Sequence, residues 1–170
     1  GVDTDFFQYS PITNKNVFLC ISRLLVSKGI REYVFAAKEI KKTNQNARFL
    51  LAGWIDDNPD SIDLKELNQW IENKDIEFLG KLNNQIEVKK AISQCSVYVL
   101  PSYREGTPRS VLEAMSMGRP ILTTDVPGCR QTVEIGSNGL LVPSMDELSL
   151  IQGVNFFLAN KNKIDEMGNN

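Results

Sequence analysis

The sequence predicts an α/β domain built on a doubly wound, parallel, six-stranded sheet with helices on both faces. Short apolar runs alternate with stretches of helical spacing along almost the whole chain of 170 residues. The composition, 42% hydrophobic and 24% charged, is that of an ordinary globular domain. Strand and helix alternation over six strands implies right-handed crossovers that cover both faces of a parallel sheet.

The predicted strands are short and apolar. They lie at residues 17–22, 48–52, 76–79, 97–100, 120–124 and 139–142. Crossing a bilayer takes about 20 consecutive apolar residues, and no run in the chain approaches that length. The sequence therefore predicts no membrane-spanning segment.

Apolar residues at helical spacing fill the intervals between the strands. The predicted helices lie at residues 30–40, 64–71 and 88–95, from about 109 to 117 and from about 146 to 159. Gly118 and Pro120 follow the fourth helix, as is typical beyond a helix C-terminus. Residues 1–16 show little periodicity, and residues 161–170 begin a further helix without a partner. We expect a single domain cut from a longer chain, with an N-terminal domain and a final helix absent.

Charge and composition exclude several classes of function. With 19 basic and 21 acidic residues, the net charge of −2 lacks the positive field that nucleic-acid binding requires. The absence of histidine excludes Ser-His-Asp and Cys-His catalysis and any His-ligated metal site. Cys20, Cys95 and Cys129 are far apart and indicate reduced, buried thiols. Because no secretory signal is visible either, we expect a cytoplasmic protein.

The loop after the first strand carries two cations near the start of a helix. Ligands of doubly wound sheets bind beyond the carboxyl ends of the strands, where this loop lies. Arg23 and Lys28 stand at or just before the helix predicted at 30–40, and a helix N-terminus favours anions. The two cations and the positive end of the helix dipole repel one another, and a diphosphate bound between the cations would relieve this repulsion. The alternative is that both cations are solvated at the surface. No Gly-x-Gly-x-x-Gly follows the strand, so the dinucleotide fingerprint of dehydrogenases is missing.

The loop after the fourth strand leads into a helix with an unusual first turn. Thr107 is predicted as its N-cap and Pro108 as its first residue. Arg109 stands where acidic residues are usual, which again indicates an anion. Glu105 precedes the helix and Glu113 lies about two turns inside it, too far apart for a shared proton but suited to accept bonds from ligand hydroxyls. An Arg109–Glu113 ion pair and a solvated Glu105 are the structural alternatives.

Glycines mark three other strand ends. Pro127 and Gly128 fit the centre of a type II turn, with the glycine at positive φ. Gly53 and Gly80 follow the second and third strands, where they form simple turns or let a ligand approach the backbone closely.

Taken in order, these residues resemble the C-terminal, donor-binding half of retaining GT-B glycosyltransferases of family 4, also called group 1. The implied fold is Rossmann-like, and the resemblance covers nearly the whole chain. The matching segments are Gly1-Val2-Asp3 with Phe6, Arg23, Lys28-Gly29, Ala52-Gly53, Phe78-Leu79-Gly80, Pro101-Ser102, Glu105 and Glu113 with Ala114-Met115, Gly118-Arg119-Pro120 and residues 136–142.

The resemblance implies a role for each candidate site residue. Arg23 and Lys28 would hold the diphosphate of a nucleotide-sugar donor, and Glu113 would bind the ribose hydroxyls. Glu105 would be the catalytic residue, near the reacting carbon of the sugar. The further donor-binding residues are Gly53, Lys81 and Leu82, of which the last two would meet the base, and Gly106, Thr107, Arg109 and Ser110, whose amides would meet phosphate or sugar.

One motif departs from the common family pattern. Members usually have Glu-Gly-Phe-Gly where this chain has Glu105-Gly106-Thr107-Pro108, and Pro108 offers no N–H. The Glu-Gly-Thr-Pro-Arg-Ser form resembles a bacterial branch that builds surface polysaccharides on polyprenyl-diphosphate carriers, often from UDP-sugars.

The implied activity is transfer of a hexose or N-acetylhexosamine from a nucleotide-diphosphate donor, a UDP-sugar, with retention of configuration. Fixed cations and amides would stabilise the leaving diphosphate, so no metal or other cofactor is expected. A glycan or polyprenyl-diphosphate-linked acceptor would bind the absent N-terminal domain, so this chain alone is expected to be inactive. Any peripheral association with the inner face of the membrane is expected of that domain. The alternatives are a GT-B-fold epimerase or phosphorylase and a non-catalytic nucleotide-sugar-binding module.

Overall fold

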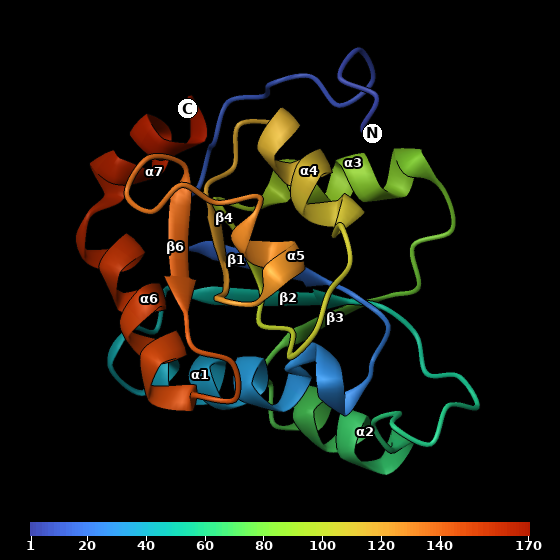
Figure 1. Ribbon diagram of the computed structural model, residues 1–170. Helices are drawn as coiled ribbons and strands as arrows, with labels where there is room; N and C mark the ends of the chain where they lie inside the picture. The colour runs from blue at the N-terminus through green and yellow to red at the C-terminus, as the bar shows by residue number, and fades with distance from the viewer.

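A computed structural model describes residues 1–170 and confirms the doubly wound parallel sheet (Figure 1). The six strands pair in the order β3-β2-β1-β4-β5-β6, and every pairing is parallel. Each predicted strand is confirmed to within one residue at either end. The strands are β1 (Val17–Ile21), β2 (Arg48–Ala52), β3 (Glu77–Gly80), β4 (Val97–Leu100), β5 (Ile121–Thr124) and β6 (Gly139–Val142).

The helices are η1 (Val26–Lys28), α1 (Ile30–Thr43), α2 (Leu64–Glu72), α3 (Gln85–Gln94), α4 (Arg109–Ser116), α5 (Pro127–Arg130), α6 (Glu147–Ala159) and α7 (Lys161–Gly168). The five predicted helices are confirmed as α1, α2, α3, α4 and α6, and the structure adds the short helices η1 and α5. Asp63, Asn84 and Asp146 cap α2, α3 and α6, because each side chain accepts a first-turn N–H. The cap at Asn84 explains why α3 begins three residues before the predicted start. None of the helices combines the length and apolar character needed to cross a bilayer.

Two hydrophobic cores lie on opposite faces of the sheet. Adjacent strand residues point to opposite faces, so Phe18 and Phe49 enter one core while Leu19 and Leu50 enter the other. The Phe18 and Phe49 rings stack with their centroids 5.1 Å apart. Helices α1, α2, α6 and α7 cover this first face, and α3, α4 and α5 cover the second (Figure 1).

The two ends of the chain pack against the domain. Phe7 is fully buried in the second core, and Ile164 and Met167 bury α7 in the first. The expectation that the C-terminal helix has no partner is therefore wrong. It fails because only two residues of α7 are buried, too few for a helical period to show which face is covered.

Arg119 is the largest fully buried side chain and fastens the N-terminal segment to the sheet. Its guanidinium donates to the carbonyl oxygens of Ser10, Ser93, Cys95 and Met117. Because its partners are these carbonyls and the Ser10 hydroxyl, the charge is satisfied by neutral dipoles rather than by a carboxylate.

The start of α4 differs from the prediction. Thr107 is not the N-cap and Pro108 is not the first helical residue. Pro108 is itself the N-cap, with an extended ψ of 102° and no side-chain cap, and the helix begins at Arg109. The hydroxyl of Tyr98, on β4, lies 2.6 Å from Ser110 Oγ and anchors the first turn at this position.

The predicted type II turn at Pro127-Gly128 is also wrong. These residues open the short helix α5, with Pro127 in its first turn and no positive φ at Gly128. A glycine is required here for another reason. A Cβ on Gly128 would lie 1.7 Å from the carbonyl oxygen of Gly106 and 2.3 Å from that of Glu105. Glycine is required at position 128 by a contact between segments that are distant in the sequence, and local turn preferences do not predict such contacts.

We predict that Gly128→Ala destabilises the chain while Gly106→Ala does not. A Cβ at position 128 would overlap the backbone of the β4–α4 loop, whereas one at position 106 meets nothing within 4 Å. Overpacking of this kind costs about 1–3 kcal/mol. Thermal unfolding followed by circular dichroism should show a clear drop in Tm for Gly128→Ala alone, and equal Tm values for the two variants would contradict the prediction.

Candidate functional site

The strand order reverses between β1 and β4, which are neighbours in the sheet although β2 and β3 separate them in sequence. Ligands of doubly wound folds bind in the crevice outside the carboxyl ends of such strands. A cleft of about 220 Å³ opens there, between the loops that follow β1 and β4. It is lined by Ile21, Ser22, Arg23, Lys28, Leu100, Glu105, Thr107, Pro108, Arg109 and Ser110.

An ion pair joins the two loops inside this cleft. Lys28 Nζ donates to both carboxylate oxygens of Glu105, at 2.9 and 2.7 Å. The side chains are only 23% and 11% exposed, respectively, so the alternative of a solvated Glu105 is wrong. Gly29 makes the approach possible. Its φ is +73°, and a Cβ there would lie 1.9 Å from the carbonyl oxygen of Pro101.

Arg23 is also paired. Its Nη2 and Nε donate to Asp56 Oδ2, at 2.7 and 3.1 Å, while the side chain remains 41% exposed. These bonds, together with those from the Asn58 N–H and the Ser61 hydroxyl, lower the pKa of Asp56. Asp56 therefore orients Arg23, and the Nη1 donors of Arg23 make no hydrogen bond within the chain.

The N-terminus of α4 supplies backbone donors to the cleft. The first helical bonds run from Val111 and Leu112 to the Pro108 carbonyl, so the N–H groups of Arg109 and Ser110 have no carbonyl partner. The helix dipole adds positive potential at this end. The site therefore combines two free backbone N–H groups with the cations Arg23 and Lys28. Such a set of donors is suited to bind an anion.

Glu113 lies beneath this helix start rather than in the wall of the cleft. Its side chain is 10% exposed, and Arg109 Nε lies 3.9 Å away, beyond hydrogen-bond length. The ion pair proposed as a structural alternative is therefore weak. Burial raises the pKa of Glu113, and Arg109 offsets only part of that effect.

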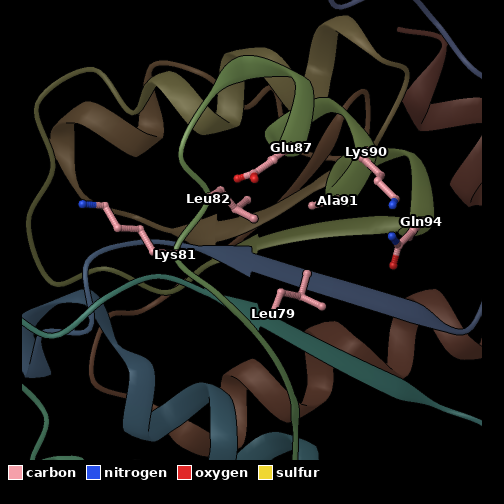
Figure 2. A pocket seen from close by; sticks show the side chains of 7 residues that line it. All are labelled: Leu79, Lys81, Leu82, Glu87, Lys90, Ala91 and Gln94. Atoms are coloured by element: carbon pink, nitrogen blue, oxygen red, sulfur yellow. The ribbon is translucent and has the colours of Figure 1, made fainter.

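Lys81 and Leu82 belong to a second cleft. It has a volume of about 260 Å³ and follows one side of α3 above β3 (Figure 2). Its lining residues are Leu79, Lys81, Leu82, Glu87, Lys90, Ala91 and Gln94. In Figure 2 the Leu82 and Glu87 side chains lie close together, whereas the Lys81 side chain points away from them.

Gly53 lies between the two clefts, at the end of β2, and its role in the structure is packing. A Cβ there would lie 1.9 Å from the carbonyl oxygen of Ser22. Gly106 lines neither cleft, and its carbonyl faces Gly128 instead. The structure thus brings six of the predicted residues together at the switch point. They are Arg23, Lys28, Glu105, Thr107, Arg109 and Ser110.

Sequence reasoning missed two residues that organise the cleft. The Tyr98 hydroxyl accepts from the Ile21 N–H at 3.2 Å and lies 2.6 Å from Ser110 Oγ, so it joins β1, β4 and α4. The other is Asp56, the partner of Arg23. The Asp and Asn residues from position 56 are typical of Asx turns, but nothing in their spacing links Asp56 to Arg23.

Residues 2–170 match the family described as Glycosyl transferases group 1. The chain is 31% identical over 156 residues to N,N'-diacetylbacillosaminyl-diphospho-undecaprenol alpha-1,3-N-acetylgalactosaminyltransferase of Campylobacter jejuni, covering 92% of the chain and 39% of that protein. It is 24% identical over 164 residues to the capsular polysaccharide biosynthesis glycosyltransferase CapM of Staphylococcus aureus, covering 96% of the chain and 42% of that protein. The chain thus spans about two fifths of these curated relatives.

Solved structures share the fold. Anabaena HepE in complex with UDP-glucose superposes with a TM-score of 0.84 at 23% identity, over 100% of this chain and 49% of HepE. The C-terminal domain of the group 1 family protein LpcC from Francisella tularensis also gives 0.84, at 20% identity, over 100% of this chain and 94% of that one. Since the family match extends over nearly the whole chain and the fold is that of the C-terminal GT-B domain, the chain belongs to the group 1 glycosyl transferases.

Proposed function

We propose that this chain is the donor-binding half of a retaining glycosyltransferase that uses a nucleotide-diphosphate sugar, a UDP-sugar. The observation that carries the proposal is the meeting of Lys28, Glu105 and the N-terminus of α4 at the carboxyl ends of β1 and β4. The complex of HepE with UDP-glucose supports the choice of donor, because HepE has the same fold over the whole of this chain.

The diphosphate is proposed to bind Arg23, Lys28 and the amides of Arg109 and Ser110. These groups are held in place before the ligand arrives, by Asp56, by Gly29 and by the Pro108 cap. Negative charge on the diphosphate grows as the bond to the sugar breaks, so fixed donors favour the transition state more than the bound donor. The reaction is accordingly proposed to proceed without a metal ion.

The two carboxylates are proposed to contact hydroxyl groups at different points of the donor. Glu105, which lines the cleft, is the proposed catalytic residue and contacts the transferred sugar near its reacting carbon. Glu113, beneath the helix start, accepts bonds from the ribose. Gly106 and Thr107 contact phosphate or sugar through the backbone, while Lys81 and Leu82 meet the base.

The acceptor is proposed to bind a part of the enzyme outside this chain. The curated relatives are more than twice as long, and one is named for a diphospho-undecaprenol acceptor. We propose a glycan or polyprenyl-diphosphate-linked acceptor, a role in bacterial surface polysaccharide synthesis and a location at the cytoplasmic face of the membrane. This chain alone would then bind donor without transferring sugar.

Binding of UDP tests the proposal directly. Isothermal titration calorimetry with UDP, GDP and ADP should show selective binding of UDP. Lys28→Ala should weaken that binding about 10-fold or more, because it removes charge-assisted bonds. Arg48→Ala is the matched control, since Arg48 pairs with Glu77 at the amino end of β2, far from the cleft. Equal losses in both variants, or no binding of any nucleotide, would contradict the proposal.

Glu105→Gln should bind UDP several-fold more tightly than the unchanged chain. In the free chain Glu105 occupies Lys28 through two hydrogen bonds, and its charge opposes an incoming diphosphate. Glutamine keeps the shape, removes the negative charge and leaves Lys28 only one acceptor oxygen in place of two. Uridine, which lacks phosphates, should bind the two proteins equally. Unchanged or weaker UDP binding by the variant would show that the ion pair does not compete with the donor.

Glu113→Gln should stabilise the free chain at pH 7 and weaken its binding of UDP. Because burial raises the pKa of Glu113 above its ordinary value of 4.5, the folded state holds the proton more tightly than the unfolded state. Ionisation therefore lowers stability as the pH rises through the folded pKa, and the penalty is absent below the ordinary value. Tm should rise by a few degrees at pH 7, and the gain should shrink as the pH falls toward 4.

The exposed Glu134 provides the control, because Glu134→Gln should change neither Tm nor binding. A Glu113→Gln variant no more stable than the original at pH 7 would contradict the expected cost of this buried carboxylate.

A further inference from the structure

Tyr103 stands two residues before Glu105, in the β4–α4 loop. Its side chain is partly buried, yet it belongs to neither hydrophobic core. The Tyr103 hydroxyl donates to Glu32 Oε2, at 2.5 Å, in the first turn of α1. A polar contact across 71 positions of the chain, rather than core packing, therefore explains where this ring lies.

Glu32 is an unusual partner for a tyrosine hydroxyl. Its second carboxylate oxygen, Oε1, is buried and makes no hydrogen bond. A buried acceptor without a donor destabilises the fold, so the stability of α1 alone does not explain Glu32. Burial and the bond to Glu32 raise the pKa of Tyr103 above its ordinary value of 10, so the hydroxyl is the donor at neutral pH. A hydrogen bond to a charged acceptor is roughly twice as strong as a neutral one.

The start of α1 and the segment just before it also hold Glu105. The Tyr103 N–H donates to the Ser27 carbonyl at 2.8 Å. Lys28 Nζ donates to both carboxylate oxygens of Glu105, at 2.9 and 2.7 Å. One short stretch of chain thus holds the β4–α4 loop at two positions, of which one is the proposed catalytic residue and the other is Tyr103.

These two contacts respond differently to the donor. The diphosphate is proposed to bind Lys28, and this binding competes with the ion pair to Glu105. The Glu105 side chain has no other hydrogen-bonding partner in the chain. Tyr103 and Glu32 do not line the cleft at the switch point, so the bond between them remains when the ion pair opens. It then ties the β4–α4 loop to α1 in place of that ion pair.

We propose that Tyr103 is a positioning residue, whose hydrogen bond to Glu32 holds Glu105 against the transferred sugar once the donor has displaced this carboxylate from Lys28. The inference rests on the proposed function, since it concerns the same site. Tyr103 itself contacts no part of the donor and acts through Glu105. Its hydroxyl therefore affects recognition of the sugar and not of the nucleotide.

Tyr103→Phe tests this role, because it removes one hydroxyl and keeps the ring. Calorimetry with UDP, UDP-glucose, UDP-N-acetylglucosamine and UDP-N-acetylgalactosamine gives the ratio of UDP-sugar affinity to UDP affinity, and the sugar with the largest ratio is used. In Tyr103→Phe the affinity for UDP should stay within about 2-fold of the original. The ratio should fall about 5-fold or more, as expected when hydrogen bonds to a charged group are weakened.

Variants of Glu32 show whether the hydroxyl acts through this partner. Glu32→Gln keeps a carbonyl oxygen that can accept from Tyr103, so it should retain most of the ratio. Glu32→Ala should lower the ratio as much as Tyr103→Phe does. The double variant Tyr103→Phe/Glu32→Ala should be no worse than either single variant, because both changes remove the same bond.

Two matched controls remove similar groups elsewhere. Tyr9→Phe removes the hydroxyl of an exposed tyrosine. Glu39→Ala removes another carboxylate of α1, which pairs with Lys42 at the surface. Neither control should change the affinity for UDP or the ratio.

The outcomes separate this inference from the proposed function. If the unchanged chain binds UDP and the ratio is the same in Tyr103→Phe, the positioning role is overturned while the proposed function stands. Equal losses of UDP and UDP-sugar binding would also overturn it, since the bond would then only stabilise the fold. UDP-sugars that bind no better than UDP to the unchanged chain would show that Glu105 is not held against the sugar. If the unchanged chain binds no nucleotide, both proposals fail together.

Discussion

The close approach of the loops after β1 and β4 is the constraint on which the site depends. Gly29 adopts a left-handed conformation directly against the carbonyl of Pro101, and no side chain fits between the two segments. The Tyr103 N–H donates to the Ser27 carbonyl at 2.8 Å and fastens the same contact. Without this approach Lys28 would not reach Glu105, and the cleft at the switch point would have no opposite wall.

A second close contact, between α5 and the β4–α4 loop, helps to hold that loop in place. Gly128 lets α5 touch the carbonyls of Glu105 and Gly106, so the β4–α4 loop is held from two directions. Tyr98 then joins β1 to the first turn of α4. The residues that carry the free amides of that turn, Arg109 and Ser110, line the cleft. Preorganisation here comes from backbone packing and only in part from side-chain pairing.

Most charged side chains of the site form ion pairs with one another or with a neighbouring residue, but one of them lowers the stability of the fold. Lys28 and Glu105 satisfy each other, and Asp56 satisfies Arg23. Glu113 is the exception, because it is buried without a hydrogen-bonding partner and its pKa is raised. Buried groups of this kind are typical of functional sites, where stability is given up for binding. Arg119 shows the opposite case, a buried charge whose donors all find carbonyls and whose role is to fasten the chain.

The sequence by itself determined the sheet, its strands and most of its helices, because these follow from hydrophobic periodicity and from local signals such as the Asp63, Asn84 and Asp146 caps. It also indicated Arg23, Lys28 and Glu105 as candidate site residues, because charged residues just beyond the ends of predicted strands can be recognised from the sequence.

Only the tertiary structure decided how these residues are paired. Glu105 binds Lys28 across 77 positions, and Arg23 binds an aspartate 33 positions away. The link between Tyr98 and Ser110 in the first turn of α4, and the need for glycine at 128 beside the Gly106 carbonyl, likewise come from contacts between separate elements. Such contacts depend on how elements pack, and a local pattern carries no information about a neighbour that is distant in the chain.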